Sequence, residues 1–76
     1  MKMKIEEANY TQARAEVEDA SSDVAFYDFQ LFKSTEFGEE KNLPMIQKQL
    51  KQAEERLALA KIEERKAWTS LITSIL

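Results

Sequence analysis

The chain has 76 residues, a formal net charge of −3, and neither cysteine nor histidine. This length allows a single domain, 1–76, and the composition excludes disulfide bonds, the common zinc sites and histidine-based catalysis. Because a domain of this size buries only ~60% of the surface that its unfolded chain exposes, we expect oligomerisation to contribute to its stability.

The residue composition favours a folded helical protein. The chain contains one glycine and one proline, and 33% of its residues are charged and 43% hydrophobic, a balance that predicts an all-α fold. Its apolar stretches fall short of the ~20 residues that cross a membrane. Glu6 and Glu7 follow the basic N-terminus at the point where a secretory signal is apolar. We therefore expect a cytoplasmic protein that does not bind membranes.

The first helix is predicted from about residue 4 to residue 37. Its apolar residues recur at alternating spacings of three and four, which places them on one stripe of a helix. The stripe consists of Tyr10, Ala13, Val17, Ala20, Val24, Tyr27 and Leu31. Ser21, Ser22 and Asp23 favour turns, so they indicate either a break or a polar turn within a continuous helix. The stripe keeps its phase across them, which favours the continuous helix.

A turn is predicted at about residues 38–42. Gly38 suits the left-handed conformation in which many helices end. Residues 39–41 are expected to form a polar loop, Asn42 can cap the next helix, and Pro44 suits its first turn. A turn of this length joins two adjacent antiparallel helices.

The second helix is predicted from residue 43 to residue 75, with the same alternating spacing. Its stripe consists of Leu43, Ile46, Leu50, Ala53, Leu57, Ala60, Ala67, Trp68, Leu71 and Ile75. Trp68 falls on the centre of this stripe, so we predict that it is a core residue. Glu64 interrupts the stripe, either as a buried polar residue that fixes the register or, as we favour, near the edge beside Arg14 or Lys61.

The two stripes predict an antiparallel two-helix hairpin with an alanine-rich, coiled-coil-like seam, which we expect to assemble into a four-helix bundle. Residues 1–42 carry five basic and ten acidic side chains and residues 43–76 carry six and four, so charge also favours pairing of the two helices. One register pairs Val24 with Ala53, Ala20 with Leu57, and Val17 with Ala60. A slip of one heptad gives acceptable layers too.

Several apolar residues point away from both stripes and have no partner within a two-helix hairpin. They are Phe26, Phe29, Phe32, Leu59 and Ile62. We predict that they form a protein-binding face, which either makes the core of a homodimer or binds a different protein, most directly through the three phenylalanines. The apolar C-terminal segment 68–76 is expected to pack against Ile5 and Met3, with a docking tail as the alternative.

We find no motif for catalysis, for a metal or for a cofactor, and therefore expect none. Direct nucleic-acid binding is not expected either, because the first helix is acidic and phosphate contacts require a basic face. An alternative function is that of a phage- or plasmid-type inhibitor whose carboxylates block a basic site on a host protein. The candidate carboxylates are Glu16, Glu18, Asp19, Asp23 and Asp28.

The alanines at heptad core positions, 13 and 20 in the first helix and 53, 60 and 67 in the second, resemble those of Rop. Rop is a small plasmid regulator whose hairpins dimerise into a four-helix bundle and bind RNA. The resemblance implies a bundle, but its RNA-binding function is not carried over because the first helix here is acidic. Two long helices around a short turn containing proline are also similar to small type III secretion components and chaperones, which is a further alternative.

Overall fold

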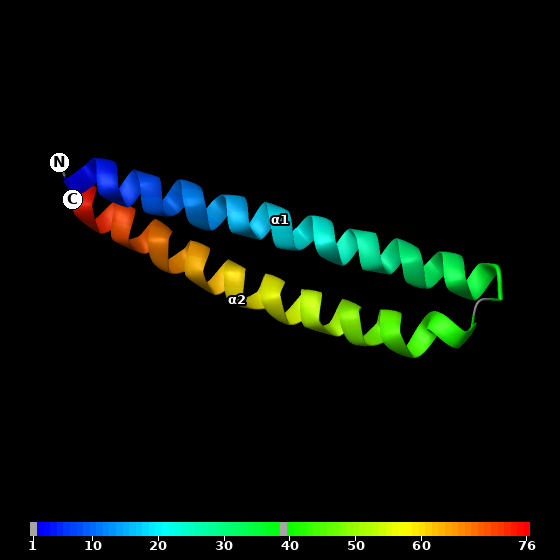
Figure 1. The fold of residues 1–76 in the computed structure, drawn as a ribbon. Coiled ribbons are helices and arrows are strands. Elements are labelled where there is room, and N and C mark those ends of the chain that lie inside the picture. The colour runs from blue at the N-terminus through cyan, green and yellow to red at the C-terminus, as the bar shows by residue number, and fades with distance from the viewer. Residues whose placement is uncertain (1, 39) are drawn as a thin grey trace.

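The computed structural model describes residues 2–38 and 40–76, and within them the chain forms two long helices joined by a tight turn (Figure 1). Helix α1 spans Lys2–Glu36 and helix α2 spans Leu43–Ile75. The helices run antiparallel, so the two ends of the chain lie together and the turn lies at the other end of the molecule. The predicted all-α antiparallel hairpin is therefore confirmed.

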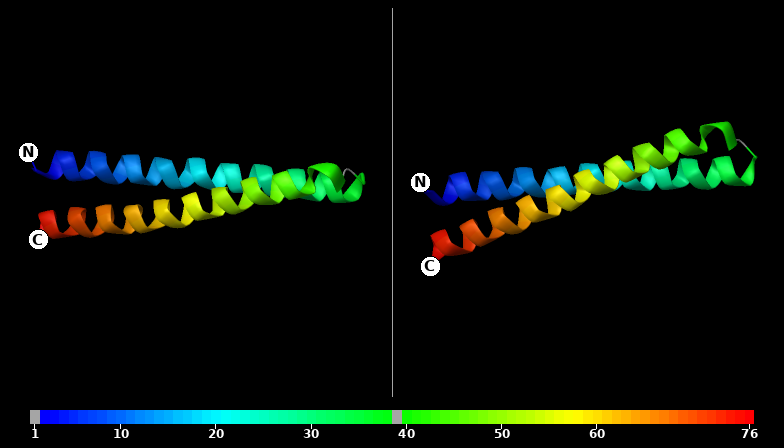
Figure 2. Two further views of the ribbon diagram at one scale, coloured as in Figure 1. Left: turned by 60° about the horizontal axis from the view of Figure 1, so that its bottom comes forward. Right: turned by 90° about the horizontal axis from the view of Figure 1, so that it is seen from below.

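The hairpin is a thin rod. Its principal extents are 55 × 13 × 13 Å, and the radius of gyration of its Cα atoms is 17.0 Å. The helices are inclined to each other, and α2 passes across α1 in the right-hand view of Figure 2. A compact domain of this length has a radius of gyration of about 11 Å. The molecule therefore has one layer of contact between its helices and no second layer behind it.

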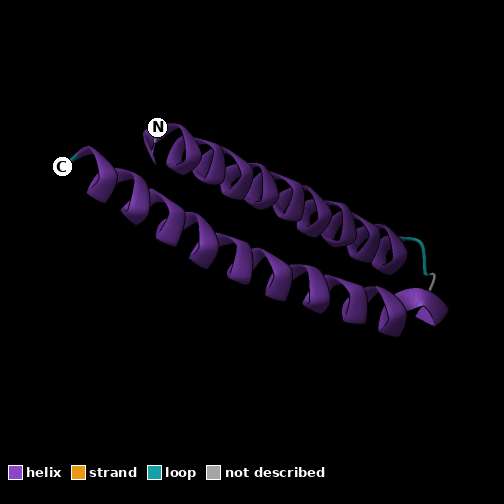
Figure 3. Ribbon diagram, turned by 60° about the vertical axis from the view of Figure 1, so that its left-hand side comes forward, coloured by secondary structure: helices purple, strands orange, loops and turns teal. Residues whose placement is uncertain are grey.

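Both helices are continuous over their full ranges (Figure 3). In α1 the segment 21–23 stays helical, so the continuous helix that the stripe favoured is confirmed. The Ser22 hydroxyl donates a hydrogen bond to the Glu18 carbonyl oxygen at 3.0 Å. This bond satisfies the hydroxyl within the helix, which removes its competition with the backbone hydrogen bonds.

The turn lies at the predicted place, and its last three residues are helical. Gly38 has a φ of 70°, the left-handed conformation predicted for it, and the Phe37 amide donates to the Lys33 carbonyl oxygen at 3.0 Å. Residues Glu40–Asn42 form a short 3-10 helix, whereas Glu39 lies outside the described residues. Asn42 occupies the N-cap position of α2 without a side-chain capping hydrogen bond, and Pro44 lies in the first turn.

The core between the helices is small. The buried side chains are Ala20, Ser34, Ile46, Ala53, Ala60 and Leu71. Among the described residues no large side chain is completely buried, and most of the remaining stripe residues are half-buried. Ala20 has no exposed surface at all, so an alanine is the most completely buried of these residues. The seam therefore gains close packing but buries little apolar volume.

The C-terminal part of the seam differs from the prediction. Trp68 is 47% exposed, because the alternating spacing continues through Ala67 to Leu71 and leaves Trp68 about 100° away from the centre. Ile75 is also exposed, since it lies at the open end of the hairpin. Ile5 is exposed as well, so the expected packing of the C-terminal segment on Ile5 is wrong. The side chain of Met3 lies outside the described residues.

The register is that of the predicted pairing of Ala20 with Leu57. Arg56, the residue before Leu57, binds Asp19 and Asp23, which lie on the two sides of Ala20 along α1. A slip of one heptad would move α2 by about 10 Å along α1 and separate Arg56 from one of these carboxylates. The open question of the register is thus settled by the ion pairs at the edge of the seam.

Candidate protein-binding surfaces

The five residues predicted to bind protein are all exposed. Their exposed fractions range from 51% for Ile62 to 64% for Leu59, with the three phenylalanines between these values. Each lies on the outer surface of its helix, away from the buried seam residues. More than half of the surface of each of these residues therefore stays exposed in the hairpin, and their role in binding another protein stays a prediction.

The structure does not bring the five residues together on one face. Phe29 and Ile62 each point almost directly away from the seam, at ~100° of helix rotation per residue, so they lie on opposite outer surfaces of the hairpin. Phe26 and Phe32 are separated by about 120° around the axis of α1. One flat partner can cover only part of this set.

The edge of the hairpin that carries Arg56 has an open groove near the turn. Phe26 and Met45 lie on its two walls, Ser34 and Ile46 lie among its lining residues, and its volume is ≈ 300 Å³. A neighbouring groove leads from Tyr27 to Arg56. Sequence reasoning missed Met45 and Phe37, which are both exposed near the turn. Their position outside the stripes was the available signal. We call this edge the Arg56 side.

The opposite edge carries a second open groove of ≈ 500 Å³. The rings of Tyr10 and Trp68 lie there with their centroids 5.2 Å apart and their planes tilted by 50°. Lys61, Glu64 and Arg65 also line this groove. We call this edge the Trp68 side. By the helical period it also includes several exposed residues of low polarity, among them Ala25, Phe32, Ala58, Ile72 and Ile75.

Glu64 is half-buried in the seam and lines the groove on the Trp68 side. Within residues 2–38 and 40–76 it forms no ion pair within 4 Å, and Arg14, one of its expected partners, lies 3.8 Å from Glu18 instead. The favoured edge position is consistent with its partial exposure, but the expected ion pair to Arg14 or Lys61 is absent among the described residues. Glu64 therefore interrupts the apolar seam without a charged partner across it.

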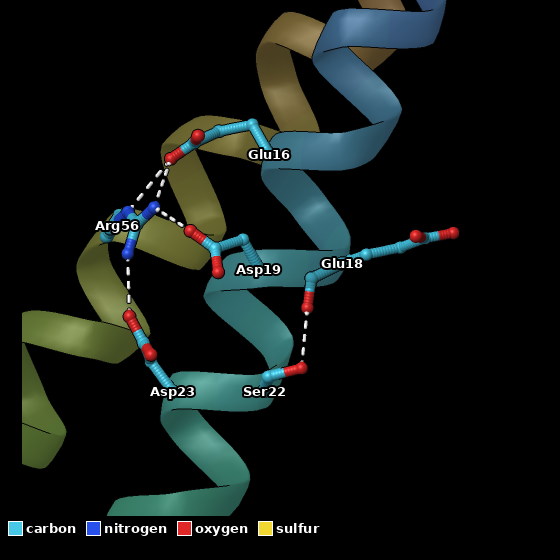
Figure 4. A network of polar contacts seen from close by, with 6 residues as sticks. All are labelled: Glu16, Glu18, Asp19, Ser22, Asp23 and Arg56. Carbon is cyan, nitrogen blue, oxygen red and sulfur yellow. Dashed lines mark hydrogen bonds and ion pairs between the residues drawn. The ribbon is translucent and has the colours of Figure 1, made fainter.

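Arg56 holds three carboxylates of α1 (Figure 4). Its guanidinium donates to Glu16 at 2.6 and 2.8 Å, to Asp19 at 2.8 Å and to Asp23 at 2.6 Å. The three acidic residues come from successive turns of α1 that face one position of α2. Hydrogen bonds from the guanidinium to Asp19 and Glu16 raise the pKa of Arg56 above its ordinary value. This cluster ties the two helices together at the middle of the rod.

The same cluster changes the interpretation of the acidic residues. Three of the five carboxylates proposed for an inhibitor accept hydrogen bonds from Arg56, and a fourth, Glu18, lies 3.8 Å from Arg14. Their charge is thus partly neutralised within the hairpin. The Arg56 cluster was missed because the sequence was read for stripes, although acidic residues spaced three and four apart opposite one arginine were a usable signal.

Other kinds of site find no support in the described part of the chain. No group of three or more carboxylates is placed to hold a metal ion there. Neither α1 nor α2 combines the length and the hydropathy needed to cross a membrane. Comparison of the chain with protein-family models, curated proteins and solved structures gives no match. The exposed apolar surfaces of the hairpin are therefore the strongest candidates for a functional site.

Proposed function

We propose that this protein is a non-enzymatic protein-association module that works as a homo-oligomeric helical hairpin, most simply as a homodimer with four packed helices. The observation that carries this proposal is the amount of surface that the single hairpin exposes. The shape, the size of the core and the position of the exposed apolar side chains support it together.

The exposed area of the hairpin is too large for a monomer of its mass. The accessible surface is 6099 Å² for a chain of 8.8 kDa, whereas a compact monomer of that mass exposes about 4,800 Å². The difference is about 1,300 Å² for each chain. If two chains bury this difference, their interface covers about 2,600 Å², which lies in the range of obligate homodimers.

The apolar side chains make this surface costly to leave in water. Four phenylalanines are each more than half exposed, and they are Phe26, Phe29, Phe32 and Phe37. Full burial of one such side chain contributes ~1.5 to 3 kcal/mol, against a total stability of only about 5 to 15 kcal/mol for a typical domain. Because these phenylalanines lie on different surfaces of the hairpin, a second copy covers only some of them, and each one that it covers adds stability that the small seam lacks.

The test is the molar mass in solution by multi-angle light scattering. We expect twice the mass of the chain for the native protein and a lower mass for a variant with Phe26→Ser, Phe29→Ser and Phe32→Ser. The matched control replaces two exposed glutamines that lie away from the Trp68 side, Gln12→Ser and Gln52→Ser, and should keep the native mass. Circular dichroism of each variant shows whether its helices persist.

A native chain that is helical, stable and monomeric at micromolar concentration would overturn the proposal. The exposed apolar residues would then be left for a different protein. Equal loss of mass in the serine variant and in the glutamine control would also count against it, because the phenylalanines would have no special part in association.

A further inference from the structure

The Arg56 side and the Trp68 side of the hairpin differ in how well each is suited to pack against a second copy. On the Arg56 side the middle of the rod is occupied by one guanidinium and three carboxylates, which stay hydrated in the isolated hairpin. Burying this cluster under another protein would require removal of its water, and the excess carboxylates have no further cation there. The Arg56 side is therefore a poor surface for a second copy.

The Trp68 side has the properties that close helix packing needs. Its middle carries Ala25 on α1 and Ala58 on α2, both exposed, and small residues of this kind let a second pair of helices approach. Phe32 lies toward the turn end, while Trp68 and Ile72 lie toward the chain ends, and all three are exposed. Large apolar side chains thus lie at both ends of this face, and small side chains lie at its centre.

The charges on the Trp68 side are divided between the helices. By the helical period α1 contributes three acidic residues and one basic residue to this side, which are Glu7, Arg14, Glu18 and Asp28. α2 contributes more basic than acidic residues to this side, three against two, which are Lys51, Lys61 and Arg65 against Glu54 and Glu64. A partner that places its α2 against this α1 therefore brings basic residues close to Glu18 and Asp28. Arg14 instead lies level with the partner segment between two basic residues, so the complementarity is confined to these acidic positions.

We propose that a second copy of the chain packs on the Trp68 side, with its α2 against this α1 and with both turns at the same end of the dimer. This inference rests on the proposed function and adds the interface and the orientation. A two-fold rotation about the long axis of the rod produces this arrangement, and each chain then offers the same face to the other.

The register within the hairpin supports this orientation. Glu18 lies at the level of Leu59, so Lys61 of the second copy is two residues, or about 3 Å, farther along. Asp28 lies at the level of Gln49, and Lys51 is displaced by the same two residues. A lysine side chain spans this displacement. With the turns at opposite ends, α1 would instead lie on α1 of the other copy, and acidic residues would face acidic residues.

A matched pair of substitutions tests the choice of side. Phe26 and Phe32 are the same residue type on the same helix with similar exposure, but Phe26 lines the groove of the Arg56 side and Phe32 lies on the Trp68 side. We expect Phe32→Ser to weaken dimerisation at least tenfold and Phe26→Ser to change it less than threefold, as measured by analytical ultracentrifugation. The neighbouring exposed residues Ala58 and Leu59 provide a second pair, Ala58→Arg and Leu59→Arg.

The orientation is tested by a distance measurement between spin labels. Because the chain has no cysteine, Glu36→Cys gives one labelled site per chain close to the turn. Turns at the same end give a label distance of about two to three helix diameters, ~20 to 30 Å. Turns at opposite ends give a distance that approaches the 55 Å length of the hairpin, which would overturn the proposed orientation.

The outcomes separate this inference from the proposed function. A native chain that is monomeric in solution would overturn both the proposed function and this inference. A native dimer that Phe26→Ser or Leu59→Arg dissociates while Phe32→Ser and Ala58→Arg leave it intact overturns the Trp68 side, but self-association remains. A dimer that Phe32→Ser dissociates and whose labels lie close together supports the interface and the orientation.

Discussion

Arg56 is the side chain that connects the two helices through charge. The hydrogen bonds from its guanidinium to Asp19 and Glu16 raise its pKa, so its positive charge is present at every pH below the ordinary arginine pKa. Each separate ion pair at an exposed edge contributes little. Here one arginine is shared by three carboxylates that would otherwise repel one another, and a network of this kind has a larger effect than an isolated pair.

Replacing Arg56 therefore has a predictable effect. We expect Arg56→Gln to lower the melting temperature clearly, because Glu16, Asp19 and Asp23 are left close together without a cation. The effect should shrink in 1 M NaCl, where the Debye length falls to ~3 Å. The measurement is thermal unfolding by circular dichroism at low and at high salt.

Arg14→Gln is the control for this prediction. Arg14 has one partner within its own helix, Glu18 at 3.8 Å, and both side chains are largely exposed. Its loss should shift the melting temperature only slightly. If both substitutions lower it equally, the Arg56 cluster has no special role in holding the helices together.

Gly38 allows the chain to reverse between the helices. Its φ of 70° is unfavourable for residues with a Cβ, yet a Cβ placed there would meet no atom within 4 Å. Gly38→Ala should therefore lower the free energy of unfolding by about 1 kcal/mol through backbone strain alone. Gly38→Asn should cost less, because asparagine tolerates this conformation. Urea unfolding measures both, and equal costs for alanine and asparagine would argue against this cause.

At the scale of the elements, the alanines of the seam set the distance between the helices. Ala20, Ala53 and Ala60 are buried at the places where larger residues would separate the axes. Because interiors are closely packed, additional volume at such a position forces neighbouring side chains out of their preferred rotamers. The short side chains are thus a condition of the close contact and also the reason that the core is small.

Ala20→Leu is expected to lower the free energy of unfolding by about 1 to 3 kcal/mol through overpacking. Ala15→Leu is the matched control, since Ala15 is exposed on the outer surface of the same helix and should change stability by no more than about 0.5 kcal/mol. Chemical unfolding of both variants at the same protein concentration gives the comparison. A stabilised Ala20→Leu variant would show that the seam contains unused space.

Both helices were predicted well because the alternating spacing of three and four residues continues over nearly their whole length. Nine consecutive turns of alternating spacing in α2 specify a helix and its inner face without ambiguity. Ser34 was missed although it continues the spacing from Leu31, because a hydroxyl does not count as apolar. Trp68 was placed in the core because it was assigned to the centre of the stripe, whereas its neighbour Ala67 holds the seam position. The prediction thus missed one seam residue because of its polarity and misplaced the centre of the stripe by one residue at Trp68.

The candidate site was less accessible to sequence reasoning. The exposure of Phe26, Phe29 and Phe32 follows from their positions outside the stripe, and the structure agrees with it. Their division between two edges follows from the helical period, which places Phe26 and Phe32 about 120° apart around α1. The level at which each faces α2 depends on the register, which the sequence left open by one heptad. Only the contacts of Arg56 distinguish the two edges, and these require the relative position of α1 and α2.

At the scale of the whole molecule, folding and association are expected to be one process. The rod buries few large side chains in its own seam, so in the proposed dimer much of the apolar contact that stabilises its helices would form between chains. The unfolded chain is then in equilibrium with the folded dimer rather than with a folded monomer. Mass action makes the stability of such a system depend on the concentration of the protein.

The melting temperature of the native chain should therefore rise with concentration. With an unfolding enthalpy of about 0.7 kcal/mol per residue for two chains, a hundredfold increase in concentration raises the melting temperature by about 10 °C. The measurement is differential scanning calorimetry at high protein concentration combined with circular dichroism at low concentration, which together cover the hundredfold range. For the Phe32→Ser variant we expect a lower melting temperature than that of the native chain at each concentration, because its weaker dimer needs a higher protein concentration to reach the same stability. A native chain whose melting temperature stays constant over this range would show instead that the hairpin is stable alone, with its phenylalanines free for another protein.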